Sequence, residues 1–345
     1  MLSIYTMDRS NEWDNVVRTF EKYDTYWLSG YVKAFQLHGE GEPLLFHFDN
    51  GEVRGINVVM KRDVANCKSF KGVIPENTYF DFSTPYGYGG WLIEGENPKP
   101  LFIEYEKWCR ENGIISEFVR FHPVIENHIA CEKIYEAVPL GEVVTMDISD
   151  DETIWANITS KNRNMIRKAQ KNGIRIYNGR YEDIFKVFRE IYNETMDKDS
   201  ADEYYYFGEE FYKSILDDLP YNAQMFYAMY EGQVIAASIM LMANGMMNYH
   251  LSGSRREFSG LAPTNLLLYE AAKWGCFNGY KTLYLGGGVG SAEDGLFKFK
   301  KAFYRPEELK RFVIGKKIFD QDKYNELTLL RKDLPESGFF PKYRA

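Results

Sequence analysis

The stretch LLYEAAKWGCFNGYKTLY, residues 267–284, decides the fold because the chain contains a similar stretch earlier on. FIEYEKWCRENGIISEF, residues 102–118, aligns with it at a shift of 166 residues, which pairs Trp108 with Trp274 and brings the two Asn-Gly pairs together. In both copies the pattern is typical of a helix that ends at a glycine and is followed by a strand.

A second pair of related segments lies before each of these helices. PLLFHFDNGEVRGINVVM (43–60) and AQMFYAMYEGQVIAASIM (223–240) are both apolar runs interrupted by a glycine turn, at Gly51 and at Gly232. Such runs predict antiparallel hairpins. Each half would then be a hairpin, a helix and a further strand, which is a mixed α/β unit. We expect an N-terminal domain over 1–148 and a C-terminal, catalytic domain over 149–345.

Composition excludes several classes of protein. The 345 residues are 45% hydrophobic and 27% charged, which indicates an ordinary globular chain. A net charge of −8 disfavours binding to duplex DNA. The start of the chain lacks a signal-peptide pattern, and the most apolar run, 234–243, is too short for a transmembrane segment. The four cysteines form no CxxC pair, so we expect no metal site and a cytoplasmic location.

Residues 154–180 contain no acidic residue but seven basic ones. Arg163, Arg167 and Lys171 recur every four residues and would share one face of a helix. Guanidinium groups bind phosphate oxygens in a bidentate manner, so this face could hold a phosphate or a pyrophosphate. The alternative is a solvated helix face that balances the acidic segment near 197–210.

Two further segments could approach a ligand closely. Gly286, Gly287 and Gly288 follow a predicted strand but match neither the P-loop nor the GxGxxG pattern, so they form either a ligand-binding loop or a plain turn. The segment SGSRREFSGLAP, 252–263, joins a strand to the start of a helix, where free N–H groups favour anions.

The segment DGLFKFKKAF, 294–303, places aromatic and cationic side chains close together. As a helix it would turn Leu296, Phe299 and Phe303 toward the core and Lys298 toward solvent. Lys300 would fall between these faces, and by itself this pattern favours a structural lysine.

Taken together, these segments resemble the Fem-type aminoacyltransferases, a branch of the GNAT acyltransferase superfamily that adds amino acids to peptidoglycan precursors. The resemblance covers most of the chain. It is carried by YGYGG (86–90), SKNRNMIRKAQKNG (160–173), LAPTNLL (261–267) and GLFKFKKAF (295–303). The fold class it implies is α/β (α+β), with tandem GNAT-like domains that each hold a mixed, mostly antiparallel sheet flanked by helices.

This chain also departs from the family in places. Only about 25 residues, 196–221, separate a predicted helix from the second hairpin, so we expect no coiled-coil arm. Tyr304 stands where family members often have glycine. The acetyl-CoA signature of GNAT enzymes has Arg or Gln three residues before a glycine, whereas Arg256 lies four residues before Gly260.

The resemblance implies roles for particular residues. Phe299 and Lys300 would lie at the reaction centre, with the lysine stabilising developing negative charge. Independently of the resemblance, acyl transfer to an amine calls for a base, and Asp294 or Glu293 is the candidate. The remaining predicted residues bind substrate or donor. The substrate-binding set is Arg163, Arg167, Tyr86, Tyr88, Arg255 and Arg256, and the donor-binding set is Pro263, Thr264, Asn265, Gly286, Gly287 and Gly288.

Three functions are consistent with these residues. The first is an acyltransferase that moves an aminoacyl or acyl group directly onto an amine of a cell-envelope or glycan precursor. The second is an acetyl-CoA-dependent N-acetyltransferase acting on an amino sugar, and the third is a non-catalytic ligand-binding protein that keeps the fold. The donor would be aminoacyl-tRNA or acyl-CoA, without a tightly bound cofactor. The partners would be a phosphorylated sugar or lipid-linked precursor and the acceptor end of a tRNA.

Overall fold

The computed structural model describes residues 1–331 and 338–345. The chain forms two compact units, which we call the first unit (1–140 and 312–345) and the second unit (141–311). The division near residue 140 lies close to the predicted boundary at 148. The segment 312–345 differs from the prediction, because it belongs to the first unit and not to the C-terminal domain.

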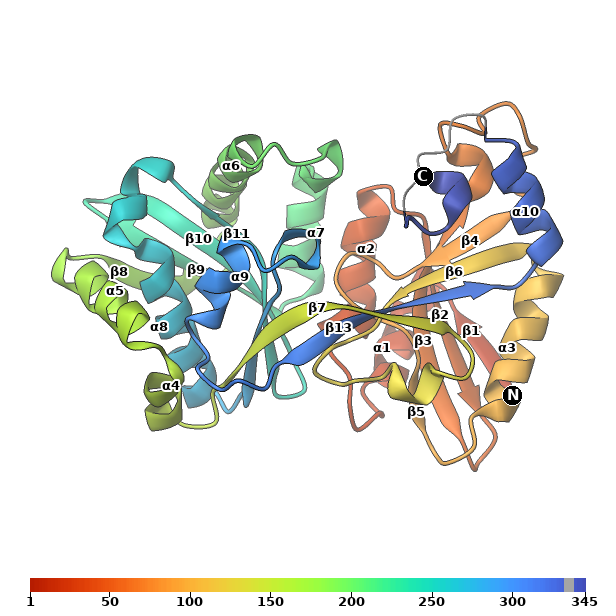
Figure 1. The fold of residues 1–345 in the computed structure, drawn as a ribbon, viewed down its shortest axis with the longest axis horizontal. Helices are drawn as coiled ribbons and strands as arrows, with labels where there is room; N and C mark the ends of the chain where they lie inside the picture. The colour runs from red at the N-terminus through yellow and green to blue at the C-terminus, as the bar shows by residue number, and fades with distance from the viewer. Residues whose placement is uncertain (332–337) are drawn as a thin grey trace. The chain divides into compact units, whose positions relative to one another are not determined.

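The first unit is built on a mixed sheet whose strands are antiparallel, except for the parallel pair β4–β6. Figure 1 labels the elements. In spatial order the strands are β1 (Leu2–Tyr5), β2 (Glu42–Asp49), β3 (Arg54–Asp63), β4 (Phe80–Ser83), β6 (Ile114–Arg120) and β13 (Lys310–Ile318), and β5 (Leu92–Glu94) pairs with β3. The helices are α1 (Ser10–Val17), α2 (Ser29–Leu37), α3 (Lys99–Glu111) and α10 (Gln321–Leu329).

A buried carboxyl group lies in the core of the first unit. Glu117 on β6 is fully buried and accepts hydrogen bonds from Asn57 Nδ2 (2.9 Å), Tyr105 Oη (3.0 Å) and Tyr135 Oη (2.7 Å). Burial raises the pKa of Glu117. Asn57 Nδ2 also lies 3.4 Å from Tyr105 Oη, so the carboxyl group is the centre of a buried hydrogen-bond network in the core.

The second unit repeats the plan with its own mixed sheet, in which β11 and β12 form the parallel pair. In spatial order its strands are β8 (Arg175–Gly179), β9 (Ala223–Tyr230), β10 (Gln233–Ala243), β11 (Met246–Ser254), β12 (Thr282–Gly286) and β7 (Glu136–Asp147). Its helices are α4 (Asp151–Asn157), α5 (Ser160–Lys171), α6 (Glu182–Lys198), α7 (Glu209–Asp218), α8 (Pro263–Phe277) and α9 (Gly295–Lys301).

The helices α6 and α8 pack on opposite faces of the second sheet. A β-bulge separates the two halves of β11, because Tyr249 and Leu251 pair with consecutive residues of β10 and leave His250 as the additional residue. Below the bulge, Met247 packs beneath α8, and above it Gly253 lies directly against the backbone of α6 at Ile191. A Cβ at Gly253 would come within 2.8 Å of the Ile191 carbonyl oxygen, so only glycine allows α6 to lie this close.

The predicted duplication and fold class are confirmed. The hairpins β2–β3 and β9–β10 correspond, and so do the helix–strand pairs α3–β6 and α8–β12. Residues 199–222, between α6 and β9, contain α7 and short turns and no coiled-coil arm, as expected. The chain therefore consists of two units built on the same plan.

The last strand of each sheet comes from an unexpected part of the chain. β7 follows β6 in sequence, but its residues 144–147 pair with β12 of the second unit. β13 follows the second unit in sequence, but its residues 314–318 pair with β6 of the first unit. The two copies have thus exchanged their final strands, which explains why 312–345 belongs to the first unit.

Candidate functional site

The candidate active site lies in the second unit, where β11 and β12 stop pairing with each other. Their parallel ladder covers only 246–248 and 282–284, although β11 continues to Ser254. In the first unit the equivalent strands stay connected further along, because Thr84 N donates to Phe118 O (3.1 Å) and Gly89 N donates to Arg120 O (2.8 Å). In the first unit these backbone groups bond to each other. At the ends of β11 and β12 the corresponding groups do not face each other in a ladder, so they can bond to a ligand.

Lys300 lies at the end of β12. Its Nζ donates to the carbonyl oxygen of Gly287 at 2.7 Å, and a Cβ added to Gly286 would lie 3.4 Å from the same Nζ. Gly286 has a φ of +81°, a conformation that favours glycine and that turns the chain immediately after the strand. Burial lowers the pKa of Lys300 to about 8, and the nearby Asp294 carboxylate opposes this shift. The ammonium form is thus held in a poorly solvated place, where its charge acts strongly on a neighbouring oxyanion.

The helix α9 that carries Lys300 begins at Asp294. The Asp294 carboxylate accepts hydrogen bonds from the backbone N–H groups of Phe297 (2.8 Å) and Val289 (3.1 Å). These backbone hydrogen bonds lower the pKa of Asp294. A carboxylate with a lowered pKa is a weaker base, so the structure gives Asp294 the role of an N-cap and does not favour the predicted role as general base. Glu293, the other predicted base, is exposed.

The apolar residues of α9 anchor the helix. Phe303 is fully buried and Phe297 is nearly so, whereas Leu296, predicted to face the core, is 40% exposed. The predicted site residue Phe299 is half-buried and packs edge-on against Phe303, with ring centroids 5.5 Å apart. Lys298 is exposed, as predicted.

The first turn of α8 holds three of the predicted donor-binding residues, Pro263, Thr264 and Asn265. Ala262, at the N-cap, has a left-handed conformation (φ 58°) and offers no side-chain cap, and Pro263 follows as the first helical residue. Asn265 Nδ2 donates to Asn162 Oδ1 at 2.7 Å, which joins α8 to α5. Asn162 is 2% exposed, and its Nδ2 has no hydrogen-bond partner among the described residues. A helix N-terminus with an additional buried donor is suited to an anionic ligand.

The basic helix α5 begins beside the end of α9, because Thr159 N donates to Ala302 O at 3.0 Å. Arg163 donates to Trp155 O at 3.2 Å, and the Arg167 guanidinium carbon lies 5.1 Å from the centre of the Trp155 ring. The Arg163 guanidinium carbon also lies 5.8 Å from the centre of this ring, so Trp155 orients both arginines.

Of the two predicted substrate-binding arginines 255 and 256, Arg255 already has partners within the protein. Arg255 Nη1 lies 2.6 Å from Glu194 Oε1 on α6, and Arg255 Nε donates to Val234 O at 3.2 Å. Arg256 is exposed at the start of the short 3₁₀ turn before α8. The structure thus gives Arg255 a role in fixing α6 to the sheet.

Tyr86 and Tyr88 belong to the first unit, where Tyr88 lies beside a buried polar pair that the sequence did not suggest. His122 Nε2 and Asp24 Oδ2 are 2.9 Å apart and fully buried, and the Tyr88 ring lies 5.4 Å from the imidazole. The Arg120 guanidinium carbon lies 5.6 Å from the centre of the Tyr86 ring. Because 98 residues separate His122 from Asp24, no local pattern could have connected them.

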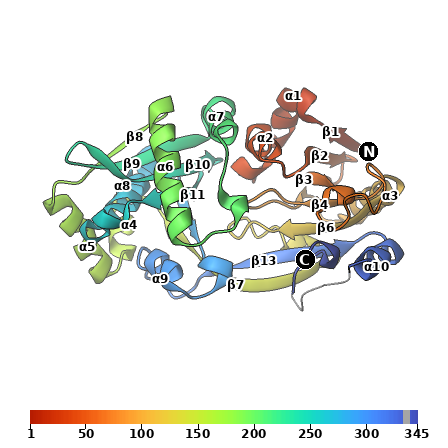
Figure 2. The same cartoon turned by 90° about the horizontal axis from the view of Figure 1, so that it is seen from above.

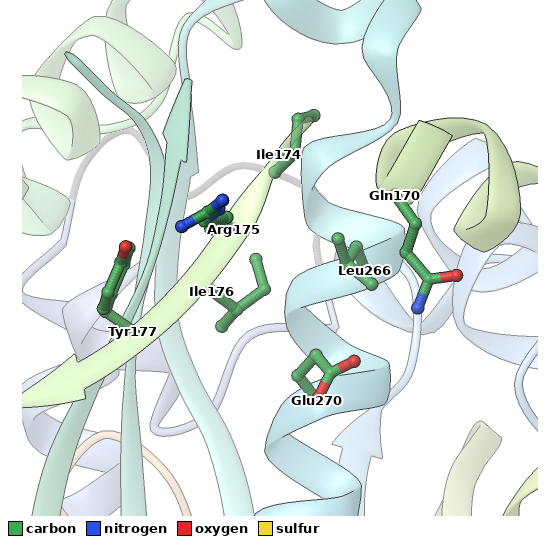
Figure 3. Close-up of a pocket in the computed structure, with 7 residues that line it drawn as sticks. All are labelled: Gln170, Ile174, Arg175, Ile176, Tyr177, Leu266 and Glu270. Atoms are coloured by element: carbon green, nitrogen blue, oxygen red, sulfur yellow. The ribbon is translucent and has the colours of Figure 1, made fainter. Parts of the chain in front are cut away.

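A separate groove of about 380 Å³ lies beside α5 and α8 (Figure 3). Gln170 comes from α5, Leu266 and Glu270 come from α8, and Ile176 comes from β8. Lys300 and the glycine turn do not line this groove. Among the described residues, no group of three or more His, Cys, Asp or Glu side chains could hold a metal ion. Nor does any helix in that part of the chain have the length and apolarity needed to cross a membrane.

Comparison with known proteins agrees with this geometry. Residues 160–301, which include α5, α8, the glycine turn and Lys300, match the family described as the acetyltransferase (GNAT) domain. This part of the second unit is therefore similar to a GNAT-type domain. No curated protein sequence matches the chain.

The solved structures define the fold more narrowly. FemX is similar over 94% of this chain and 99% of its own, with a TM-score of 0.66 and 14% sequence identity. L-PGS from Bacillus licheniformis is similar over 89% of this chain and 91% of its own, with a TM-score of 0.57 and 15% identity. The C-terminal domain of a putative lysylphosphatidylglycerol synthetase from Agrobacterium fabrum covers 90% and 91%, with a TM-score of 0.56 and 14% identity. The Fem-type resemblance predicted from the sequence is thus confirmed for the fold.

Proposed function

We propose that this chain is an acyltransferase that moves an aminoacyl or acyl group directly onto an amine of a cell-envelope or glycan precursor. The observation that carries the proposal is Lys300, a poorly solvated ammonium held by the Gly287 carbonyl at the end of β12 that no longer pairs with β11. An ammonium in such a place stabilises the oxyanion that forms when an amine attacks a carbonyl.

The reaction proceeds through one tetrahedral intermediate. The amine nitrogen forms a bond to the carbonyl carbon, and the carbonyl oxygen becomes an anion next to Lys300. The bond to the leaving oxygen or sulfur then breaks, and the proton lost by the amine ends on that leaving group. Because Asp294 is engaged as the N-cap of α9, we assign no side chain as the base, and water carries this proton.

Two features support an anionic donor and a phosphorylated acceptor. The open N-terminus of α8 and the buried Asn162 amide suit the phosphates of acyl-CoA or of the acceptor end of an aminoacyl-tRNA. Arg163 and Arg167, both oriented by Trp155, suit the phosphate of a sugar or lipid-linked precursor. The names of the lysylphosphatidylglycerol synthetases, whose fold is similar, favour an aminoacyl donor.

A second candidate is an acetyl-CoA-dependent N-acetyltransferase that acts on an amino sugar. The match of residues 160–301 to the acetyltransferase domain favours it. Titration of the protein with acetyl-CoA and with aminoacyl-tRNA separates the two candidates, since tight binding of the coenzyme supports the second. Transfer from neither donor to any amine would leave the third function, a ligand-binding protein.

The direct test is Lys300→Ala, assayed by transfer of radiolabelled acyl groups from both donors to phosphorylated amine acceptors. Loss of a group that stabilises the oxyanion reduces turnover by ~10²–10³-fold. The matched control is Lys298→Ala, because Lys298 is an exposed lysine on the same helix. Near-normal turnover in Lys300→Ala would exclude the assigned role of this lysine.

A further inference from the structure

The charged side chains on α5 are all positive. In Figure 2 this helix lies at the left of the second unit, and its Asn162 bonds to Asn265 of α8. Asn162, Ile166 and Ala169 are buried and define the inner face of α5. The rest of the helix holds five cations and no carboxylate, and only Arg163 among these cations is half-buried while the others are exposed. We call this set the α5 cations: Lys161, Arg163, Arg167, Lys168 and Lys171.

The α5 cations lack counter-charges within the protein. Among residues 1–331 and 338–345 no carboxylate forms an ion pair with any of them, whereas other cations of the second unit are paired. Lys186, for example, lies 2.9 Å from Glu182 on α6. Several of the α5 cations are three or four residues apart, and like charges at this spacing on a helix repel each other. An anionic partner from outside the chain would relieve this repulsion.

Three of the α5 cations are available to such a partner. Arg163 and Arg167 are already held near the Trp155 ring. Lys161, Lys168 and Lys171 are exposed, and their ammonium groups form no hydrogen bond with any residue that the structure describes. These three lysines can therefore reach a partner without giving up a contact within the protein.

The partner must be anionic and must also tolerate a protein whose net charge is −8. In a fluid bilayer, anionic lipids diffuse and gather beneath a local group of cations, while zwitterionic lipids remain opposite the acidic parts of the protein. An RNA duplex has a fixed row of phosphates instead, and a helix of 12 residues, about 18 Å long, covers only part of it. No exposed side chain of α5 is aromatic, so unpaired bases would find no ring to stack on. These observations favour a lipid surface.

We propose that the α5 cations dock the second unit on the surface of an anionic phospholipid bilayer. Clusters of about four to eight Lys or Arg side chains on an amphipathic helix bind anionic headgroups. The contact is electrostatic and reversible, because α5 has no exposed apolar side chain that could enter the bilayer. Docking would bring the phosphate of a lipid-linked acceptor close to Arg163 and Arg167 on the same helix. This last step rests on the proposed function, whereas the docking itself does not.

The test is sedimentation of the full chain with vesicles made of equal parts of phosphatidylglycerol and phosphatidylcholine, and with vesicles of phosphatidylcholine alone. We expect binding to the anionic vesicles only. The triple variant Lys161→Gln, Lys168→Gln and Lys171→Gln should bind them about 100-fold more weakly, since each lysine near such a surface contributes about fivefold to the affinity.

The matched control removes the same charge elsewhere, through Lys186→Gln and Lys198→Gln on α6 and Lys213→Gln on α7. These lysines already pair with carboxylates, and α6 lies on the other face of the sheet from α8, so we expect a loss of less than about fivefold. Lys300→Ala should bind the vesicles as the wild type does. Because neither donor nor acceptor is present, failure of the proposed catalytic role and failure of this inference remain distinguishable.

Three results would overturn the inference. The first is that the wild type does not prefer the anionic vesicles. The second is that the α5 variant binds as tightly as the wild type, or that the control loses as much affinity as the α5 variant. The third is that the same three lysines bind an RNA hairpin with the sequence of a tRNA acceptor stem while the wild type does not bind the vesicles, which would assign this surface to RNA.

Discussion

Replacing Lys300 by methionine should stabilise the protein while it removes transfer. Methionine has a similar length, but it does not bring a charge into a poorly solvated site. Burial lowers the pKa of Lys300 from an ordinary value of 10.5 to about 8. At neutral pH a difference of about 2.5 in pKa corresponds to about 3 kcal/mol of unfavourable free energy in the folded state. The lost hydrogen bond to Gly287 offsets about 1 kcal/mol, so we expect a net gain of about 2 kcal/mol.

The stability that Lys300→Met gains over the wild type should decrease as the pH rises. Below pH 8 both the folded and the unfolded wild-type chain carry the charged lysine, and the full penalty is present. Between pH 8 and 10.5 the folded chain releases this proton while the unfolded chain keeps it, so the stability of the wild type rises with pH. The advantage of Lys300→Met over the wild type therefore shrinks as pH rises through this window.

Urea unfolding of the wild type, of Lys300→Met and of the control Lys298→Met, followed at about pH 7 and about pH 10, measures both effects. Lys298 is exposed, so its replacement should change the free energy of unfolding by less than about 0.5 kcal/mol. The reasoning fails if Lys300→Met is less stable than the wild type at neutral pH, or if its gain does not change with pH.

Three further predictions concern other residues. In steady-state transfer assays Asp294→Asn should lower turnover less than about tenfold, because asparagine also caps helices; a loss of two orders of magnitude would instead make Asp294 the base. Replacing both Arg163 and Arg167 by alanine should raise the KM for a phosphorylated acceptor more than it lowers kcat, with Lys168→Ala as the exposed control; an unchanged KM would mean that α5 is only a surface. Glu117→Ala should destabilise the fold by about 3 kcal/mol or more in urea unfolding, since it removes the buried acceptor of Tyr105 Oη and Tyr135 Oη and the closer acceptor of Asn57 Nδ2, and a loss below about 1 kcal/mol would contradict this account.

The sequence predicted the fold well where local patterns repeat. The segments around Trp108 and Trp274 are each a helix and a strand, and such elements follow from the spacing of apolar residues and from glycine caps. The assignment of 312–345 could not be predicted in the same way. The pairing of Ile314 with Arg120 joins residues far apart in the chain, and an exchanged strand has the same local pattern as one that is not exchanged.

The candidate site was only partly predictable, because its contacts depend on backbone groups and on residues far apart in the chain. The cluster of phenylalanines and lysines located α9, but a helix of seven residues does not fix which side is buried, and Phe297 is in the core where Leu296 was expected. The capping role of Asp294 depends on backbone N–H groups that a sequence does not display. Asn162 lies within a quoted motif, yet its contact with Asn265 bridges 103 residues and appears only in three dimensions.

The exchanged strands set the order in which the protein can mature during synthesis. The sheet of the first unit lacks its final strand until residues 314–318 leave the ribosome, after the whole second unit has been translated. Until then β6 presents an open edge, to which strands of other chains can add. The nascent N-terminal half is consequently the stage most exposed to aggregation. A premature stop after residue 311 would disable the half of the protein made first and not the half made last.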